Sequence, residues 1–286
     1  MRETAGQADP AASSHDVVRY ATAAFAAARD ITARKRADAI ALENARQFEA
    51  QRVIATTLQE SFMHPLPDIE GLQLAALSLP AGREELIGGD FHDVFRRSDG
   101  VVVALIGDVM GKGMRAAGFT ETVRSAVRTA AFMMPSPDAV LKHVNHILLQ
   151  EEGGGEIVTA LLVTLGPATG RGSYASAGRP PPMRVHDGGA ETLESAGAPP
   201  LGAFVTDYDA TPFELRPGEA LVLYTDGVTE ARVTDELFGE ERLVEVLSRA
   251  TDPEPQALID LVRDAVLAFA PQLKDDVEVL AVRRGA

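Results

Sequence analysis

The chain has 286 residues, of which 45% are hydrophobic and 24% are charged, with 25 Gly and 17 Pro. This composition is typical of a globular protein with one sizeable core and excludes collagen-like and low-complexity architectures. Cysteine is absent, which excludes disulfide scaffolds, thiolate zinc sites and every mechanism that uses a cysteine nucleophile.

The formal net charge is -15, and it is distributed unevenly along the chain. Residues 1–60 contain eight basic and eight acidic side chains, which leaves 19 basic and 34 acidic side chains in the remainder. This excess argues against binding to a phosphate backbone and favours cations or basic protein surfaces. The longest aliphatic run, residues 101–106, is far shorter than the roughly 20 residues of a membrane helix, and the N-terminus lacks an apolar signal-peptide core. We therefore expect a cytoplasmic protein that binds neither nucleic acid nor membrane.

The N-terminal region predicts one or two long amphipathic helices, because residues 15–62 contain no proline and are rich in alanine and charged residues. Its apolar positions near helical spacing are Phe48, Ile54, Leu58 and Phe62. Glutamines interrupt this stripe, so the pattern fits a dimerising linker and a solvated helix equally well. Pro65 and Pro67 end the helix. We expect a helical and linker region over residues 1–66, followed by a folded domain over 67–286.

Beyond residue 67 the pattern changes to short apolar runs separated by turns, which is typical of strands. The predicted strands are 72–79, 101–106, 158–164, 171–176, 220–224 and 277–282. A turn at 167–170 predicts antiparallel pairing of the strands on either side. The predicted helices are 114–133, a second that begins at Pro137 and buries Val140, Leu141, Val144, Ile147 and Leu148, then 240–249 and 255–269. This order favours α+β layers over repeating parallel βαβ units.

Aspartates border a turn at the end of an apolar run in four separate segments. They are Asp90 with Asp93, Asp108, Asp226, and Asp275 with Asp276. One such turn is usually solvated, but four that converge would place carboxylates within reach of one another, where repulsion requires a neutralising cation. Oxygen ligands without His or Cys favour Mg²⁺ or Mn²⁺ over Zn²⁺. Two such ions would clamp a phosphoester and activate water, so that hydrolysis would need no protein nucleophile.

Two further sequence features bear on which residues could bind a metal ion. Glycines on both sides of Asp108 allow close backbone approach, so the carbonyl of Val109 is also a candidate ligand. The glycine spacing does not match a P-loop. His143 and His146 lie three residues apart on a predicted helix, but no third ligand accompanies them, and we expect a solvent-facing or capping role.

The acidic motifs occur together in the order of a known family. They are Glu85-Leu-Ile-Gly-Gly-Asp-Phe-His-Asp93, Gly107-Asp-Val-Met-Gly-Lys-Gly113, Leu221-Val-Leu-Tyr-Thr-Asp-Gly-Val-Thr-Glu230 and Asp275-Asp276. Over about residues 50–286 the chain resembles the PPM-type (metal-dependent) serine/threonine phosphatases of the bacterial SpoIIE/RsbU group. The resemblance implies an α+β fold, an antiparallel β-sandwich flanked by helices, with the phosphatase domain over 67–286 preceded by the N-terminal helical linker.

The resemblance also implies a centre of two Mn²⁺ or Mg²⁺ ions, with metal-activated water as the nucleophile and no catalytic side chain. The implied ligands are Asp90, Asp108, the carbonyl of Val109, Asp226 and Asp275. Asp93 and Asp276 are weaker candidates, expected to support the ligands or to bond to backbone. Three residues depart from the family pattern: His92 replaces tyrosine, Arg179 replaces histidine and Glu278 replaces threonine. None of the three is an implied ligand, so we expect them to affect substrate fit.

The activity that the resemblance implies is hydrolysis of phosphoserine or phosphothreonine on a protein, with an anti-sigma-factor antagonist of a partner-switching pathway as the expected substrate. Two alternatives stay open: a two-metal phosphoesterase for a small molecule, and a catalytically silent module that signals through its helical linker. Residues 28–37 resemble the exit from a PAS sensor domain, although 27 preceding residues are too few for that domain. The N-terminal helix is a candidate surface for a homodimer.

Overall fold

The computed structural model describes residues 65–81, 89–111, 114–150, 156–194 and 197–285, together with scattered residues between 22 and 47. Contacts divide the chain into two units, residues 1–54 and 55–286. The described residues of the first unit are helical and exposed. Phe48, Ile54, Leu58 and Phe62 lie outside the described residues, as does most of 28–37. The linker, its boundary at residue 66 and the PAS-like remnant therefore stay predictions.

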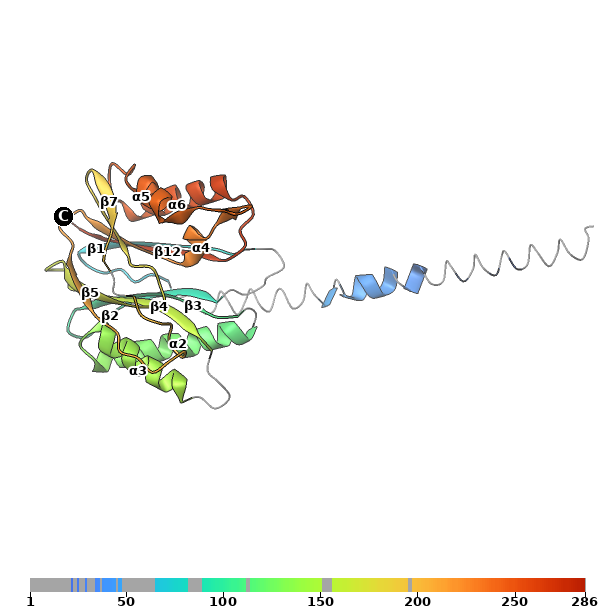
Figure 1. Cartoon of the computed structure of the whole chain (residues 1–286), viewed down its shortest axis with the longest axis horizontal. Coiled ribbons are helices and arrows are strands. Elements are labelled where there is room, and N and C mark those ends of the chain that lie inside the picture. The colour runs from blue at the N-terminus through green and yellow to red at the C-terminus, as the bar shows by residue number, and fades with distance from the viewer. Residues whose placement is uncertain are drawn as a thin grey trace, which may run out of the picture. The chain divides into compact units, whose positions relative to one another are not determined.

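Two five-stranded antiparallel sheets form the centre of the second unit (Figure 1). The first sheet contains, in spatial order, β1 (Leu72–Leu79), β12 (Val277–Arg284), β9 (Ala220–Tyr224), β6 (Met183–His186) and β7 (Gly189–Thr192). The second contains β2 (Asp90–Arg96), β3 (Val102–Val109), β4 (Val158–Leu165), β5 (Arg171–Ala177) and β8 (Thr211–Glu214). The sheets pack face to face, which confirms the predicted antiparallel β-sandwich.

Strand β3 shows why the central strands are apolar at nearly every position. Val102, Ala104 and Ile106 pack against the first sheet, whereas Val103 and Leu105 pack on the opposite face against helices. Because successive side chains of a strand point to opposite faces, a strand covered on both sides needs a continuous apolar run. Strands β9 and β12 follow the same rule in the first sheet.

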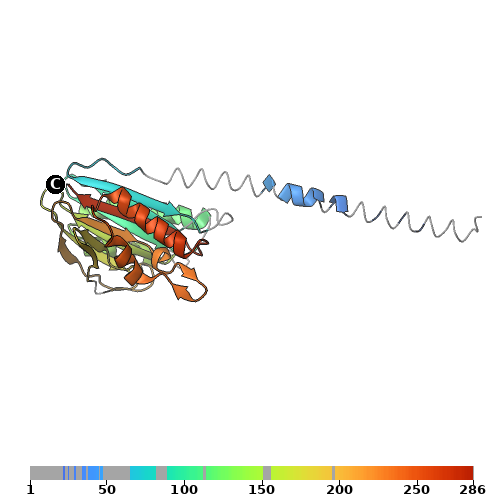
Figure 2. The same cartoon turned by 90° about the horizontal axis from the view of Figure 1, so that it is seen from above.

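Helices cover the outer face of each sheet, which completes four layers in the order helix, sheet, sheet, helix (Figure 1). The helices of the second sheet are α2 (Met114–Met133) and α3 (Pro137–Leu149), and those of the first are α5 (Gly239–Leu247) and α6 (Pro255–Phe269). Figure 2 shows α6, in red, lying along β1 and β12. The remaining elements are the short helix α4 (Asp226–Thr229) and a hairpin of β10 (Arg232–Val233) and β11 (Glu236–Leu237). No helix among the described residues is long and apolar enough to cross a membrane.

The predicted elements of the sandwich are confirmed with end shifts of a few residues, and the bounds of α2, α6, β1 and β9 agree fully. One prediction on α3 was wrong: Ile147 keeps 39% of its surface exposed, whereas the other four apolar positions are buried. Helical spacing puts Ile147 at the edge of the stripe that these residues form. The sequence analysis also missed β2 and the short strands β6, β7 and β8, since polar residues interrupt their apolar pattern.

Candidate functional site

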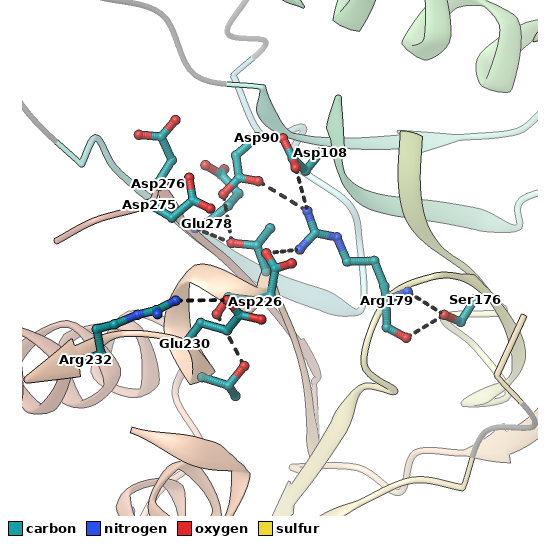
Figure 3. Close-up of polar contacts among 12 residues, drawn as sticks. Asp90, Asp108, Ser176, Arg179, Asp226, Glu230, Arg232, Asp275, Asp276 and Glu278 are labelled. Carbon is teal, nitrogen blue, oxygen red and sulfur yellow. Dashed lines mark hydrogen bonds and ion pairs between the residues drawn. The ribbon is translucent and has the colours of Figure 1, made fainter. Parts of the chain in front are cut away.

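Strand register brings the predicted ligands to one edge of the sandwich (Figure 3). In the second sheet β2 begins where β3 ends, and Asp90 lies directly opposite Asp108. In the first sheet β9 ends where β12 begins, so Asp226 follows one strand and Asp275 precedes its neighbour. Four segments that are far apart in the sequence therefore present their carboxylates at the same edge.

Three of these carboxylates surround the guanidinium of Arg179 (Figure 3). Nη1 of Arg179 lies 2.8 Å from Oδ1 of Asp226, and Nη2 lies 3.2 Å from Oδ1 of Asp90 and 4.0 Å from Oδ2 of Asp108. The arginine side chain is 0% exposed, whereas those of Asp108 and Asp226 are 35% and 46% exposed. The guanidinium is thus buried at the base of the cluster, whereas the carboxylates of Asp108 and Asp226 reach solvent.

The surroundings of the cluster disfavour the ionised forms of its carboxylates. Burial raises the pKa of Asp90 well above its ordinary value, and Arg179 opposes this shift only in part. Burial also raises the pKa of Asp108 to about 6, with further contributions from the charges of Asp226, Asp275 and Asp276. The carboxylates therefore carry more negative charge than one guanidinium neutralises, and additional positive charge would stabilise their ionised forms.

Thr225 connects the two sheets beneath the cluster. Its hydroxyl donates to Oδ2 of Asp90 at 2.8 Å and accepts from the backbone amide of Glu278 at 3.0 Å. The carboxylate of Glu278, on β12, is paired with Nδ1 of His92 on β2. Because Thr225 is fully buried, these bonds hold Asp90 in one orientation relative to both sheets.

The backbone around Asp108 leaves no room for a side chain at position 89. A Cβ atom on Gly89 would lie 2.2 Å from the carbonyl oxygen of Val109 and 2.4 Å from Oδ1 of Asp108. The amide of Val109 donates to the carbonyl of Gly89 at 3.1 Å. The Gly-Asp sequence at the start of β2 therefore lets the two strands close tightly at the point where their aspartates meet.

The two weaker candidates have different surroundings. Asp93 lies on the face of β2 that is turned toward α2, where Arg128 binds its carboxylate through two bonds of 2.5 and 2.7 Å. The period of two along a strand separates Asp93 from Asp90, which faces the other way. Asp276 accepts a hydrogen bond from the backbone amide of Ala81 at 2.8 Å, and its role at the site stays a prediction.

A divalent cation fits the donor chemistry of this edge, because several carboxylates with too little neutralising charge gather there. Within the described ranges no group of three or more His, Cys, Asp or Glu side chains is arranged so that it could hold a metal ion. The position of Arg179 supplies a physical reason, since its guanidinium lies between the carboxylates. The predicted ligand set of Asp90, Asp108, Val109, Asp226 and Asp275 therefore stays a prediction.

The sequence analysis missed the residues that organise this cluster. Arg179, His92 and Glu278 were noted only as departures from a family pattern, and the role of Thr225 was not anticipated. The signal for Arg179 was a basic residue directly after a predicted strand and a glycine. That pattern does not reveal its acidic partners, which lie 47 and 89 residues away in the chain.

Comparison with known proteins is consistent with this geometry. The profile of the family described as Stage II sporulation protein E (SpoIIE) matches residues 98–285, which is more than half of the chain. The chain belongs to the SpoIIE family. This SpoIIE-family chain is 26% identical over 244 residues to the phosphoserine phosphatase RsbU of Bacillus subtilis, with 83% of this chain and 71% of that protein covered.

Other relatives and structures agree with the family assignment. Protein IcfG of Synechocystis is 26% identical over 259 residues, with 79% of this chain but only 40% of IcfG covered. The crystal structure of the RsbU and RsbW domains of a Mycobacterium tuberculosis protein has a TM-score of 0.68 and 28% identity, and covers 77% of this chain and 62% of that one. The PP2C phosphatase domain of SpoIIE from Bacillus subtilis has a TM-score of 0.66 at 19% identity, over 75% of this chain and 62% of that one, and shares the fold.

Proposed function

We propose that this chain is a metal-dependent protein phosphatase that hydrolyses phosphoserine or phosphothreonine. The observation that carries the proposal is the convergence of Asp90, Asp108 and Asp226 from both sheets on one point at the sandwich edge. Membership of the SpoIIE family and the similarity to a phosphoserine phosphatase support it. Cysteine chemistry is excluded, because the sequence contains no cysteine.

In this proposal Asp90, Asp108, Asp226, Asp275 and the carbonyl of Val109 would hold two divalent cations, Mn²⁺ or Mg²⁺. The chemistry that such ions supply is the activation of water and the neutralisation of phosphoryl charge. Thr225 would orient Asp90 through the hydrogen bond to its carboxylate, and that bond favours the ionised form of Asp90 against the effect of burial. The exposed sides of Asp108 and Asp226 would leave the cluster open to a phosphorylated side chain on a protein surface.

The finer proposal concerns the substrate, which we infer to be phosphoserine on an anti-sigma-factor antagonist in a partner-switching pathway. The resemblance to the SpoIIE/RsbU group supports this choice. A small-molecule phosphoester is the alternative substrate, and a catalytically silent signalling module is the alternative role. The expected cytoplasmic location belongs to the same proposal.

Phosphate release decides between these functions. We expect Mn²⁺-dependent hydrolysis of an aryl phosphate and a kcat/KM at least about tenfold higher for a phosphoserine protein, because contacts outside the phosphoryl group add to transition-state binding. A higher kcat/KM for small phosphoesters than for any phosphoprotein would favour the small-molecule alternative. A folded protein that releases no phosphate with either Mn²⁺ or Mg²⁺ would favour the silent module.

We also propose that the N-terminal helix associates two copies of the chain. The apolar side chains of Phe25 and Ile40 support this proposal, since they are 73% and 61% exposed and helical spacing puts them on a similar side of the helix. Removal of residues 1–50 is expected to lower the dimer content measured by sedimentation and to change turnover several-fold. If both the association state and turnover are unchanged, the N-terminal helix is a solvated extension.

A further inference from the structure

We propose that Arg179 is a tethered counter-ion that competes with divalent cations for Asp90 and Asp226, and thereby sets the metal concentration that the protein requires. This inference rests on the metal-dependent function proposed above. It assigns a role to a residue that replaces the histidine of the family pattern.

The contacts of Arg179 place it in direct competition with a cation. Its two terminal nitrogens bond to two carboxylates, at 2.8 Å to Asp226, which follows β9 of the first sheet, and at 3.2 Å to Asp90 on β2 of the second. Divalent ions such as Mg²⁺ bind carboxylate oxygens at about 2.0–2.1 Å, closer than any guanidinium nitrogen. A cation bound to the same oxygens would face the guanidinium at short range, and their like charges would repel. A bound cation would therefore displace the guanidinium from these oxygens, or the guanidinium would keep the cation out.

Hydrogen bonds hold the backbone of Arg179 in one conformation, so its side chain starts from a fixed position. Oγ of Ser176 donates to the carbonyl of Arg179 at 2.6 Å and accepts from its amide at 3.1 Å. Gly178 has φ +74°, a conformation that L side chains rarely adopt, and its amide donates to the carbonyl of Ala198 at 2.7 Å. The turn thus fixes the base of the side chain while its far end depends on the carboxylates.

The bonding of the guanidinium itself is incomplete. Nε of Arg179 is buried and has no hydrogen-bond partner among the described residues. A buried donor without a partner is costly, so the charges of the carboxylates hold this side chain in place against that cost. A cation that takes over the carboxylates would remove the interaction that keeps the guanidinium there.

A second ion pair, between the partly exposed Arg128 and the buried Asp93, shows what a purely structural arginine looks like in this fold. Arg128 binds one carboxylate, that of Asp93, through two bonds, and its guanidinium lies 4.9 Å from the ring centroid of Phe95. Arg179 instead divides its nitrogens between the carboxylates of Asp90 and Asp226, both implied metal ligands. Arg179 is therefore placed where its positive charge can replace that of a bound metal ion.

The test measures Mn²⁺ binding to the full-length chain by calorimetry and its melting temperature with and without Mn²⁺. Arg179→Gln is expected to bind Mn²⁺ at least about tenfold more tightly than the parent, because a charge-assisted hydrogen bond is worth on the order of tenfold. Its metal-free melting temperature should fall, and the rise on adding Mn²⁺ should be larger. Arg184→Gln is the matched control, since it removes the same charge from an exposed pair with Glu191 and should bind Mn²⁺ like the parent.

The outcomes separate this inference from the proposed function. Unchanged or weaker Mn²⁺ binding by folded Arg179→Gln would overturn the competition, while an absence of Mn²⁺ binding by the parent and both variants would overturn the metal-dependent function as well. Folding of the variant only when Mn²⁺ is present would support the competition. If Arg179→Gln does not fold under either condition, Arg179→Lys decides, because one ammonium bridges the two carboxylates less well. Several-fold tighter Mn²⁺ binding is expected for that variant, and parental affinity would refute the inference.

Discussion

Replacement of Asp108 by asparagine tests the charge balance of the carboxylate cluster without changing its shape. Burial raises the pKa of Asp108 to about 6, above the ordinary 3.8 that the group has when unfolded. Below about pH 4 both states hold the proton, so this group does not affect stability. Between about pH 4 and 6 the unfolded chain releases a proton that the folded protein keeps, and the folded state loses stability as the pH rises.

The size of the effect follows from the same pKa values. The difference corresponds to about 3 kcal/mol in the absence of screening. The side chain of Asp108 is 35% exposed, and solvent screening reduces the contribution to about 1–2 kcal/mol. Without divalent cations, Asp108→Asn should therefore be more stable than the parent by about this amount above pH 6 and nearly equal to it at pH 4. In the presence of Mn²⁺ its turnover should fall by at least about a hundredfold, because an implied metal ligand is lost.

The assay combines thermal melting in a chelator at pH 4 to 8 with phosphate release at saturating Mn²⁺. Asp209→Asn serves as a control, since this exposed aspartate precedes β8 and contributes to neither property. Turnover of Asp108→Asn within about tenfold of the parent would refute the assignment of Asp108 as a ligand. A stability difference that does not change between pH 4 and pH 8 would refute the charge argument.

Three further predictions concern the framework around the site and the helices. Thr225→Val should lower the free energy of unfolding by about 2–3 kcal/mol in urea titrations, because it removes two buried hydrogen bonds while keeping the shape. Arg128→Ala should cost about 2 kcal/mol by removing two charge-assisted hydrogen bonds from the buried carboxylate of Asp93, and addition of Asp93→Asn should restore at least half of that loss. Leu141→Ala should cost about 2–4 kcal/mol, whereas Ile147→Ala on the same helix should cost less than about 1 kcal/mol. Equal losses for the two α3 variants would contradict the burial of that helix.

Much of the sandwich could be predicted because its patterns are local. Strands β9 and β12 are short apolar runs bounded by turn residues, as expected for strands buried on both faces, and helix α6 begins at a proline and buries the apolar face that its period predicts. The aspartates were found for a similar reason. Asp90, Asp108, Asp226 and Asp275 each adjoin the end of a strand, and antiparallel pairing brings such ends to one edge.

Other features depended on contacts that a local pattern does not encode. Strand β2 contains Asp90, His92 and Asp93, and it is stable because each polar side chain meets a partner from a distant segment. The alternation along that strand sends Asp93 to an arginine on α2 and Asp90 to the cluster, although three residues separate them.

By itself, the sequence determined the layers of this protein and the set of carboxylates at its edge, because hydrophobic period and turn chemistry act over a few residues. Only the tertiary structure decided that the positively charged group among those carboxylates is the guanidinium of Arg179. Arg179 follows β5 of the second sheet, Asp90 lies on β2 of the same sheet, and Asp226 begins α4 just after β9 of the first sheet. Their meeting depends on how the two sheets stack, since the energy of an ion pair is determined by distance in space and not by separation along the chain.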